Sequence, residues 1–546
     1  MEDPRAVLNL DDLLRPRTTR AQRRSSIIRQ SIVSALSSIG DDHALSQIID
    51  LEAGLPPQEV QSPALSPKSL ASPHRSSDDD DEQDTVGWDG PDDPEHPYNL
   101  PSWRIKLTGV LFACLAFLVP LSSSILAPAA HQVLIEFHND SELLEAFVVS
   151  VFVLGLAFGP LIWAPLSEIY GRLYVYHGTN LGFIAFTVAC GVAPSLSSLI
   201  AFRFFAGFFG SCILANGGGS FSDMMPVEKR GIFLTLFVLG PVLGPVVGPV
   251  GGGFLASAKG WPWLFWLVTI LVGVVSLMLL IFTKETYAPI LLRRKVERLR
   301  RETGNPRLRA KGQRELSPWV ILRHNIVRPL RLSIMSPVSI IYSLDIAIVY
   351  GILNLLFTSI SQVFQETYNF APNISGLAFL GLGVGCFIGV VTAGATSNMY
   401  TERVRAKTGG ERKPEHRIFL QPIGACLIPA GLFIYGWTAE YKVHWIAPII
   451  GEGITGLGIM LIFSSTILYL VDAFTVVAAS ALAANGLIRS IAGGLLPLAG
   501  LTLYSNLGVG WGNSVLAFIS LIILPISIGM VRYGEYLRKR YEVKNL

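Results

Sequence analysis

The feature that most constrains this chain is a series of uncharged, apolar stretches, each about 20 residues long. A stretch of this length can cross the hydrocarbon core of a bilayer as an α-helix, which pairs its backbone polar groups internally. Charged residues make up 15% of the chain, below the quarter that is usual in soluble domains. The sequence therefore predicts an all-α membrane protein with twelve spans. They cover residues 106–128, 145–166, 174–193, 198–222, 231–256, 262–283, 335–361, 374–396, 417–437, 444–470, 474–500 and 511–534.

A polar, strongly basic segment separates the first six spans from the last six, which suggests two related halves. The predicted parts are a disordered cytoplasmic N-terminal tail, a six-helix bundle, a basic cytoplasmic linker, a second six-helix bundle and a cytoplasmic C-terminal tail. In that order they span residues 1–105, 106–283, 284–334, 335–534 and 535–546. The N-terminal tail is too polar to bury a core. Its Ser-Pro pairs fit either phosphorylation or a plain solvated linker.

Arginine and lysine are concentrated in alternate loops, which fixes the predicted orientation by the positive-inside rule. The 284–334 linker, the 397–416 loop and the C-terminal tail are rich in these residues. The opposite loops hold almost none beyond Lys259 and Lys442. Both termini are therefore predicted to be cytoplasmic. Two sequons, at Asn139 and Asn373, fall in predicted outside loops, where glycosylation is possible.

The fifth span, 231–256, carries an unusual repeat of glycine and proline. Glycines four residues apart share one helix face, which lets another helix approach closely, and each proline removes a backbone hydrogen bond. We expect a packed, bent helix at a moving interface rather than a simple packing helix. Its expected partner is the glycine-rich span 374–396, which would join the two halves. The residues that define the repeat are Gly240, Pro241, Gly244, Pro245, Gly248 and Gly252.

Charged residues mark the predicted cytoplasmic end of the second span. Glu168 and Arg172 lie four residues apart on either side of a tight turn at Gly171. Both could pair with charges on neighbouring loops and close the inner side of the protein. Replacing them should shift the balance between inward-facing and outward-facing states.

Arg203 lies inside the fourth span. A cation within a span costs roughly 2.5–3.5 kcal/mol on insertion scales, so it should face a cavity or a carbonyl partner. It is either a structural tie or snorkelling side chain, or a contributor to coupling or substrate contact. We favour the second interpretation.

The second half holds further charged residues within its spans: Asp345, Glu452 and Arg489. Buried carboxylates shift their pKa upward and can carry protons, which is the minimal part of a proton-coupled carrier. Arg489 could instead pair with one acid and hold two spans together. Polar residues that could line a cavity and contact substrate are Tyr342, Tyr350, Asn354 and Asn485.

Other functional classes find no support. There is no catalytic pattern, and the nine histidines lie in tails, loops or span ends, so no metal or haem site is expected within the bilayer. No Gly-rich loop precedes a lysine, so direct use of ATP is not expected. The net charge of +3 does not suggest a nucleic-acid partner. We therefore predict no enzyme and no cofactor.

Taken in order, these segments resemble the major facilitator superfamily, and within it the fungal twelve-span drug:proton antiporters, over residues 93–540. The stretch from Pro165 to Arg172 is similar to the loop signature between spans two and three, in its fungal form with Glu168. The Arg203 region resembles the fourth-span motif whose arginine is linked to proton coupling. The repeat at 240–253 resembles the antiporter motif typical of exporters. Weaker likenesses lie at 93–97, 261–263 and 285–292.

The resemblance implies two six-helix bundles with pseudo-two-fold symmetry, rocking about a central cavity. The predicted function is proton-driven efflux of small amphipathic compounds such as drugs, toxins or secondary metabolites. Partners would be the lipid bilayer, protons and a small-molecule substrate, with a monomer in the plasma membrane or, alternatively, the vacuolar membrane. Rival interpretations are an importer or facilitator of a nutrient or organic acid, and a non-transporting membrane sensor or scaffold.

Overall fold

A computed structural model describes residues 84–90, 92–226, 229–311, 318–408, 413–475 and 478–541. These residues belong to one compact unit, Ser77–Leu546. Most of the predicted N-terminal tail, with its Ser-Pro pairs, lies outside the described residues.

The first six predicted spans form long helices because each is a mainly apolar run bounded by polar or glycine residues. Two short helical turns follow the first of them, and Gly171, with a φ of 100°, separates the second from the third. The elements are α4 (Ser102–Ser124), η3 (Ala127–Ala129), α5 (Ala130–Glu136), α6 (Glu142–Tyr170), α7 (Arg172–Gly191), α8 (Leu196–Met224), α9 (Gly231–Lys259) and α10 (Pro262–Phe282).

The last six spans repeat this plan. The eleventh and twelfth spans follow one another without a loop and are separated by a kink at Gly508, where φ is 77° and ψ is 167°. The elements are α13 (Pro337–Tyr368), α14 (Pro372–Ser375), η4 (Gly376–Ala378), α15 (Phe379–Thr408), η5 (Pro414–Ile418), α16 (Gln421–Glu440), α17 (Ile446–Ala473), α18 (Ala478–Leu521) and α19 (Ile523–Arg540).

Ten helical runs of the described residues are long and apolar enough to cross a membrane. One of them, Ala478–Arg540, contains the eleventh and twelfth spans on either side of the break. α7 is not among the ten, yet it packs against both α8 and α10. With that break and α7 counted, the structure has the twelve predicted spans.

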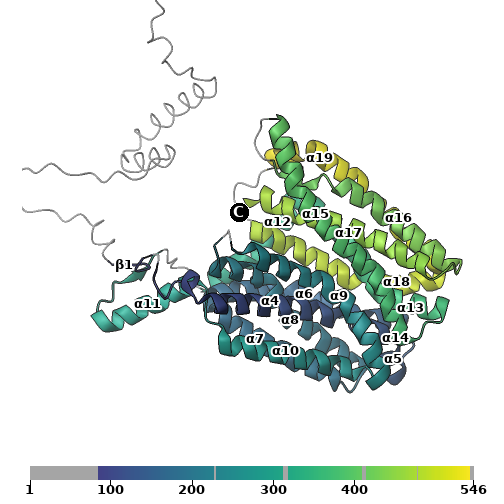
Figure 1. Cartoon of the computed structure of the whole chain (residues 1–546), viewed down its shortest axis with the longest axis horizontal. Helices are drawn as coiled ribbons and strands as arrows, with labels where there is room; N and C mark the ends of the chain where they lie inside the picture. Colours follow the sequence, from purple (N-terminus) through teal and green to yellow (C-terminus); the bar gives the residue numbers. More distant parts are fainter. Residues whose placement is uncertain are drawn as a thin grey trace, which may run out of the picture. The chain divides into compact units, whose positions relative to one another are not determined.

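The helices pack as two bundles, one from each half of the chain. α4 lies against α9, α6 against α8, and α7 against α8 and α10. In the second bundle α13 lies against α18, and α17 contacts both α15 and α16. In Figure 1 the purple-to-teal helices and the green-to-yellow helices lie side by side. The all-α fold with two six-helix bundles is confirmed.

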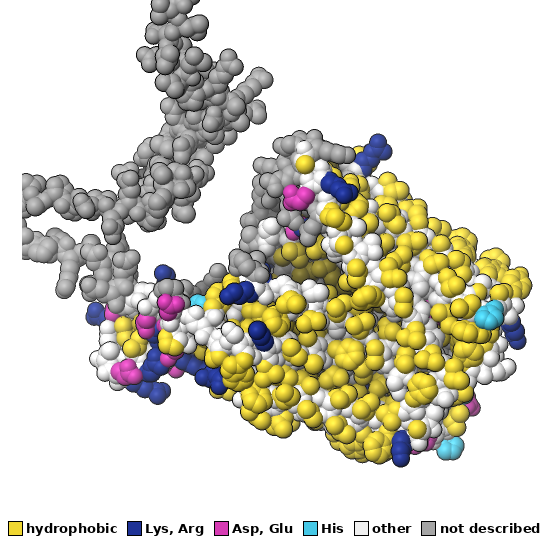
Figure 2. All heavy atoms as spheres, in the orientation of Figure 1, with side chains coloured by type: hydrophobic (Ala, Val, Ile, Leu, Met, Phe, Trp, Pro, Cys, Tyr) yellow, Lys and Arg dark blue, Asp and Glu magenta, His cyan; other side chains and the backbone are white. Residues whose placement is uncertain are grey.

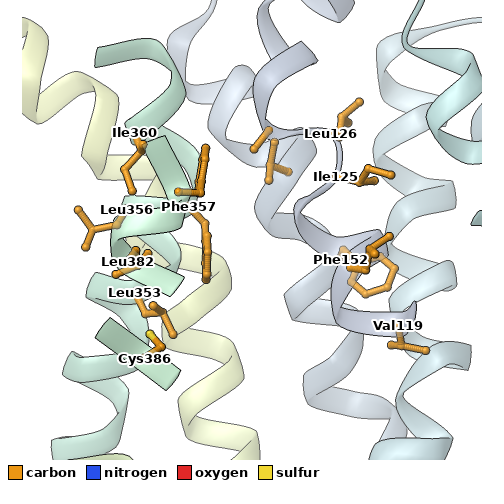
Figure 3. Packing of buried hydrophobic residues seen from close by; sticks show 14 of the residues in the cluster. Val119, Ile125, Leu126, Phe152, Leu353, Leu356, Phe357, Ile360, Leu382 and Cys386 are labelled. Atoms are coloured by element: carbon orange, nitrogen blue, oxygen red, sulfur yellow. The ribbon is translucent and has the colours of Figure 1, made fainter. Parts of the chain in front are cut away.

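Buried aliphatic and aromatic side chains fill both bundles. Figure 3 shows two groups of them: Leu353, Leu356, Phe357 and Ile360 of α13 with neighbours on α15, and a group around Phe152 of the first bundle. All of these belong to one continuous buried cluster. The cores of the two bundles are thus joined by apolar contacts.

The glycine repeat of α9 was predicted to face the span 374–396, and this prediction is wrong for the stripe that begins at Gly240. The four glycines of the stripe face α4. A Cβ at Gly240 would lie 2.8 Å from the carbonyl carbon of Ala116, and a Cβ at Gly244 would lie 2.9 Å from the backbone nitrogen of Leu121. The repeat therefore lets two helices of the same bundle approach at backbone distance.

α9 does contact α14, η4 and α15 of the second bundle, through a different face. A Cβ at Gly253 would lie 2.7 Å from the carbonyl oxygen of Pro372, and a Cβ at Gly383 would lie 2.7 Å from a methyl carbon of Val246. On α15, the other glycines at 381, 385 and 389 face α17 instead. The predicted pairing of the two helices is confirmed, but its contact face is different.

A second contact between the bundles joins α6 and α18, where Gly494 packs on the side chain of Leu154. The contacts of α9 with the second bundle use its C-terminal half, near α14. At the opposite end, α12 (Pro318–Met335) contacts both α6 and α18. We call the end that carries α12 the linker end, and the opposite end the α14 end.

The linker between the bundles contains α11 (Ala288–Thr303) and a two-residue strand, β2 (Arg309–Ala310). This strand pairs in parallel with β1 (Thr85–Val86), which precedes the first span. Figure 1 shows α11 and β1 beside one another, apart from both bundles. The pairing is an addition to the predicted all-α fold.

Side chains on the surface are sorted by polarity. In Figure 2 hydrophobic side chains cover the face of both bundles, and lysine, arginine and acidic side chains gather at the ends. Large exposed hydrophobic residues such as Leu181, Ile270 and Leu280 lie on helices that could cross a membrane or pack among them. This pattern matches a belt of lipid-facing residues.

Candidate functional site

Arg172 begins α7 at the linker end and holds three helices together. Its Nε donates to Asp223 at 3.1 Å, at the end of α8, and one terminal nitrogen donates to the Ser167 hydroxyl of α6 at 2.8 Å. The side chain of Asn216 accepts a longer bond of 3.4 Å. The predicted role of Arg172 as a pairing residue therefore has a specific partner, Asp223.

Gly171 makes this arrangement possible because its positive φ turns the chain sharply from α6 into α7. A Cβ at this position would collide with the carboxylate of Glu285. That carboxylate accepts hydrogen bonds from the backbone nitrogens of Arg172 and Leu173, each at 3.1 Å. Glu285 thus caps the N-terminus of α7, where a negative charge is favoured.

Glu168 does not pair with Arg172 by a hydrogen bond or a close ion pair among the described residues. Its carboxylate is exposed and accepts a 3.3 Å bond from Asn325 of α12. Glu168 therefore connects the first bundle to the linker, at the linker end.

The second bundle holds a matching arginine at the same end. Arg417 of η5 donates to Asp472 of α17 at 2.8 Å and to the Ser397 hydroxyl of α15 at 3.0 Å. α15 and α17 are the second and fourth spans of their half, as α6 and α8 are of theirs. Sequence reasoning missed this pair; aligning the two halves on their span ends could have found it.

Arg203 lies fully inside the first bundle, with a relative exposure of 1%. Its terminal nitrogens donate to the backbone carbonyls of Ser123 at 2.7 Å, Val149 at 3.2 Å and Ser122 at 3.4 Å. The guanidinium also lies over the ring of Phe152, 5.5 Å from its centroid. The predicted carbonyl partners exist, and two of them, Ser122 and Ser123, lie in the last turn of α4, where a cation is favoured. This geometry fits a structural tie; a role in coupling stays a prediction.

Asp345 and Glu452 are buried in the second bundle with relative exposures of 1% and 0%. All four carboxylate oxygens lack a hydrogen-bond partner among the described residues. Asp345 lies eight residues into α13, so it is about 12 Å from the linker end of that helix. Glu452 lies six residues into α17, about 9 Å from the α14 end.

Burying an ionised carboxylate without a partner is costly, so such a group favours the neutral, protonated form. The second bundle therefore holds two groups that can take up a proton at different depths. Nothing in the sequence shows which face of a helix points inward, so the prediction named the acids but could not show that they lacked partners.

Arg489 forms no ion pair with either acid among the described residues, so the predicted alternative of a tie between spans is not found there. Its guanidinium lies between two aromatic rings, 4.9 Å from the centroid of Tyr350 and 5.1 Å from that of Phe463. It is half-buried and joins α13, α17 and α18 by cation–π contacts.

The predicted polar residues of the seventh and eleventh spans form two groups. Asn485 donates to the backbone carbonyl of Tyr342 at 3.3 Å, and both residues are buried. Asn354 donates to the backbone carbonyl of Tyr350 at 2.9 Å, so its amide is engaged within α13. Substrate contact by these four residues stays a prediction.

Both sequons lie at the α14 end. The side-chain oxygen of Asn139 accepts a 3.0 Å bond from the backbone of Ser141. In the second sequon the Ser375 hydroxyl is buried and bonded to that of Ser361 at 2.7 Å. Glycosylation at Asn139 and Asn373 stays a prediction.

Another group that sequence reasoning did not identify joins the segment before the first span to the linker. Lys295 of α11 is buried and bonds Asp93 at 2.9 Å and Asp89 at 2.8 Å. Arg298 bonds Glu95 at 2.6 Å. Hydrogen bonds from the backbone of Asp89 and from Lys295 lower the pKa of Asp93 to about 2. In the sequence, the acidic residues at 93–95 and the basic residues at 295–298 were the available indication that these two segments pair.

Among the described residues, no cluster of three or more histidine, cysteine, aspartate or glutamate side chains could hold a metal ion. The chemistry that the arrangement offers is proton binding at the two acids and rearrangement of charge pairs at the linker end.

Comparison with known proteins agrees with this description. Residues 112–497 match the family model described as "Major Facilitator Superfamily". The chain is 48% identical to "MFS-type transporter tndD" of Aspergillus flavipes over 84% of this chain and 86% of that protein. It is also 48% identical to "MFS-type transporter penM" of Penicillium rubens, over 83% and 89%, and 44% identical to "Efflux pump radE" of Floropilus chiversii, over 84% and 86%.

Solved structures show the same fold at low sequence identity. A D-xylose-proton symporter is similar with a TM-score of 0.59 and 15% identity, over 79% of this chain and 98% of that one. A bacterial homologue of the human lysosomal transporter Spinster is similar with a TM-score of 0.58 and 14% identity, over 82% of this chain and 100% of that one.

Proposed function

Because the chain belongs to the Major Facilitator Superfamily of membrane transporters, we propose that it exports small amphipathic organic compounds in exchange for protons. Drugs, toxins and secondary metabolites are the substrate class. The bundles expose a central site to each side of the membrane in turn. The linker end faces the cytoplasm, as the arginine-rich loops predict.

The observation that carries the proposal is a pair of buried acids in the second bundle that have no hydrogen-bond partner among the described residues. Asp345 lies near the linker end and Glu452 near the α14 end. Each can hold a proton when its surroundings are dry and release it when the bundle opens to water. One acid near each face is what exchange of a proton between two solutions requires.

Two further observations support export of a small molecule. One relative that is 44% identical bears the name of an efflux pump. The glycine and proline repeat of α9 lies at a backbone-to-backbone contact with α4, and its other face meets the second bundle. Such a helix can shift against its neighbours without side-chain clashes. In this proposal the proton gradient drives transport, without ATP or a bound cofactor.

In this proposal the charge pairs at the linker end stabilise one conformation of the transporter between the steps of the transport cycle. The Arg172–Asp223 and Arg417–Asp472 pairs each fasten the second and fourth spans of one bundle. The Glu168–Asn325 bond ties the first bundle to α12. We place the protein in the plasma membrane as a monomer, with the vacuolar membrane as the other candidate location.

The test is efflux from cells that lack their major exporters and express this protein. Cells are loaded with a panel of amphipathic drugs and fungal metabolites, with and without a protonophore. We expect lower accumulation of at least one compound, abolished by the protonophore. The Asp345→Asn and Glu452→Gln variants should accumulate the compound as the protonophore-treated cells do.

The matched control is Glu366→Gln, which neutralises an exposed acid on the same helix as Asp345. At equal surface expression it should export like the wild type. No change in accumulation across the panel, or uptake in place of efflux, would contradict the proposal and favour an importer.

A further inference from the structure

Five buried hydroxyl groups of the second bundle lack hydrogen-bond partners among the described residues. Each of these residues is at most 1% exposed, and they come from three helices of the second bundle. They belong to Ser339, Tyr342, Ser343, Tyr469 and Ser527. Buried polar groups are almost always paired with protein or water, so a cluster of unpaired hydroxyls marks a hydrated site.

The hydroxyls form a connected group rather than scattered exceptions. The rings of Tyr342 on α13 and Tyr469 on α17 lie 4.7 Å apart. Both tyrosines belong to one small buried cluster with Met530 of α19, which lies one turn from Ser527. Three of the hydroxyls lie on one helix, at positions 339, 342 and 343, and therefore share one face of α13.

Asp345 continues this group away from the linker end. It is three residues after Tyr342, so the two side chains lie on neighbouring positions of the helix surface. The Asp345 carboxylate is also buried, and both of its oxygens lack a partner within the described residues.

Beyond this group, the ends of α17 and α19 meet the surface at the linker end. A cavity of about 680 Å³ there is lined by Asp472, Glu535 and Arg538, among other residues. Arg538 donates to the buried Glu415 at 3.0 Å. Tyr469 belongs to the same buried cluster as Ile418 of η5, and Leu537, which precedes Arg538 on α19, packs against that cluster. The sequence of polar groups thus runs from open solvent through Arg538 and Glu415 to the tyrosines.

We propose that these hydroxyls line a hydrated proton pathway from the cavity at the linker end to Asp345. The inference rests on the proposed proton coupling and deepens it by naming the route on one side of the membrane. Each hydroxyl accepts one hydrogen bond and donates one to water, so a proton passes along the water chain while the tyrosines stay neutral. A proton that enters from the cavity ends as an O–H bond on the Asp345 carboxylate. Release of the proton to the cavity follows the same route in reverse.

Charged and titratable groups on the neighbouring elements limit where the proton can rest. Tyr469 lies on α17, Glu415 on η5 and Arg538 on α19, and the last two form an ion pair. Arg489 of α18 lies over the ring of Tyr350, which is farther along α13 than Asp345. Along the described part of this route, Asp345 is the buried carboxylate that no cation neutralises.

Cysteine accessibility tests the hydrated route without reference to transport. In a background with the five native cysteines replaced, Ser343→Cys should react with a small, charged methanethiosulfonate reagent from the linker end. The matched control is Ser359→Cys, because Ser359 is also buried on α13 but its hydroxyl is bonded to the Leu355 carbonyl at 2.9 Å. We expect Ser343→Cys to react at least about tenfold faster, a difference of about 1.4 kcal/mol in barrier. Equal rates would overturn the pathway.

Proton-coupled transport in proteoliposomes tests whether protons use the proposed pathway. Tyr469→Phe should slow gradient-driven transport about tenfold and leave substrate–substrate exchange, which needs no net proton transfer, unchanged. The control is Tyr176→Phe in the first bundle, whose buried hydroxyl is paired with Ser220 at 2.8 Å. A wild type that ignores the gradient would overturn the proposed function. A coupled wild type with full activity in Tyr469→Phe would overturn the pathway alone.

Discussion

The two bundles are alike at the linker end and differ in their interiors. Each places an arginine between a serine on its second span and an aspartate at the end of its fourth: Arg172 with Asp223, and Arg417 with Asp472. Inside, the first bundle buries the cation Arg203, and backbone carbonyls accept from its terminal nitrogens. The second bundle buries Asp345 and Glu452, whose carboxylates have no hydrogen-bond partner in the part of the chain that the structure describes.

This difference teaches which half can respond to protons. A guanidinium stays charged at every relevant pH, and its carbonyl partners cannot titrate. An unpartnered buried acid changes its charge whenever water reaches it. The surroundings of Arg203 therefore provide a fixed framework, and the second bundle provides two acids whose charge can alternate.

The largest expected effect comes from removing that difference. Neutralising both acids, by Asp345→Asn with Glu452→Gln, should reduce gradient-driven transport at least about tenfold. The folded yield should stay the same or rise, because no partner is lost and a buried carboxylate is removed. Transport assays and thermal unfolding in detergent measure the two quantities. Full transport by the double variant would place the coupling groups elsewhere.

Arg203 should show the opposite behaviour. Arg203→Met leaves the carbonyls of Ser122, Ser123 and Val149 without their donor, so the protein should lose about 2 kcal/mol of stability. Thermal unfolding measures the loss, and Arg203→Lys serves as the variant that keeps the charge but not the fork of donors. A stable Arg203→Met protein that had lost only proton dependence would assign coupling to the first bundle.

The matched arginines should give matched effects. Arg172→Ala and Arg417→Ala each remove an ion pair at the linker end, and each should slow transport about fivefold, equivalent to about 1 kcal/mol. Transport rates at equal expression measure this. An effect confined to one arginine would show that the likeness of the two ends is geometric only.

The smallest effect is expected outside the bundles, at the buried pair of Asp93 and Lys295. Asp93→Asn should loosen the segment before the first span from α11, and trypsin should then cut α11 several-fold faster. Because the pKa of Asp93 is lowered to about 2 from 3.8, the pair stabilises the contact fully above pH 3.8 and loses this as pH falls through about 2. Protection of the wild type should therefore not change between pH 8 and pH 5.

Much of the fold could be predicted because length and hydropathy decide whether a segment spans a membrane. The spans, the two bundles and the contact between α9 and α15 are all present. The contact face was wrong because a glycine stripe indicates close approach without naming the neighbour. Gly240 faces α4, and Gly253 on another face of the helix meets the second bundle.

The candidate site was harder to predict because it depends on distances between helices. The sequence identified Asp345 and Glu452 as buried acids, but it offered Arg489 as a partner, and that side chain lies between aromatic rings instead. The Arg417–Asp472 pair and the hydroxyls around Tyr469 depend on the rotation of each helix about its axis. One sequence carries no information on that rotation.

The most direct test of the account is proton movement during transport by the purified protein in liposomes, followed with a pH-sensitive dye. We predict that substrate drives a counterflow of protons in the wild type and in Arg203→Lys, and that Asp345→Asn and Glu452→Gln abolish it while substrate exchange continues. Proton counterflow that persists in both neutralised variants, or that disappears only in Arg203→Lys, would contradict the assignment of coupling to the second bundle.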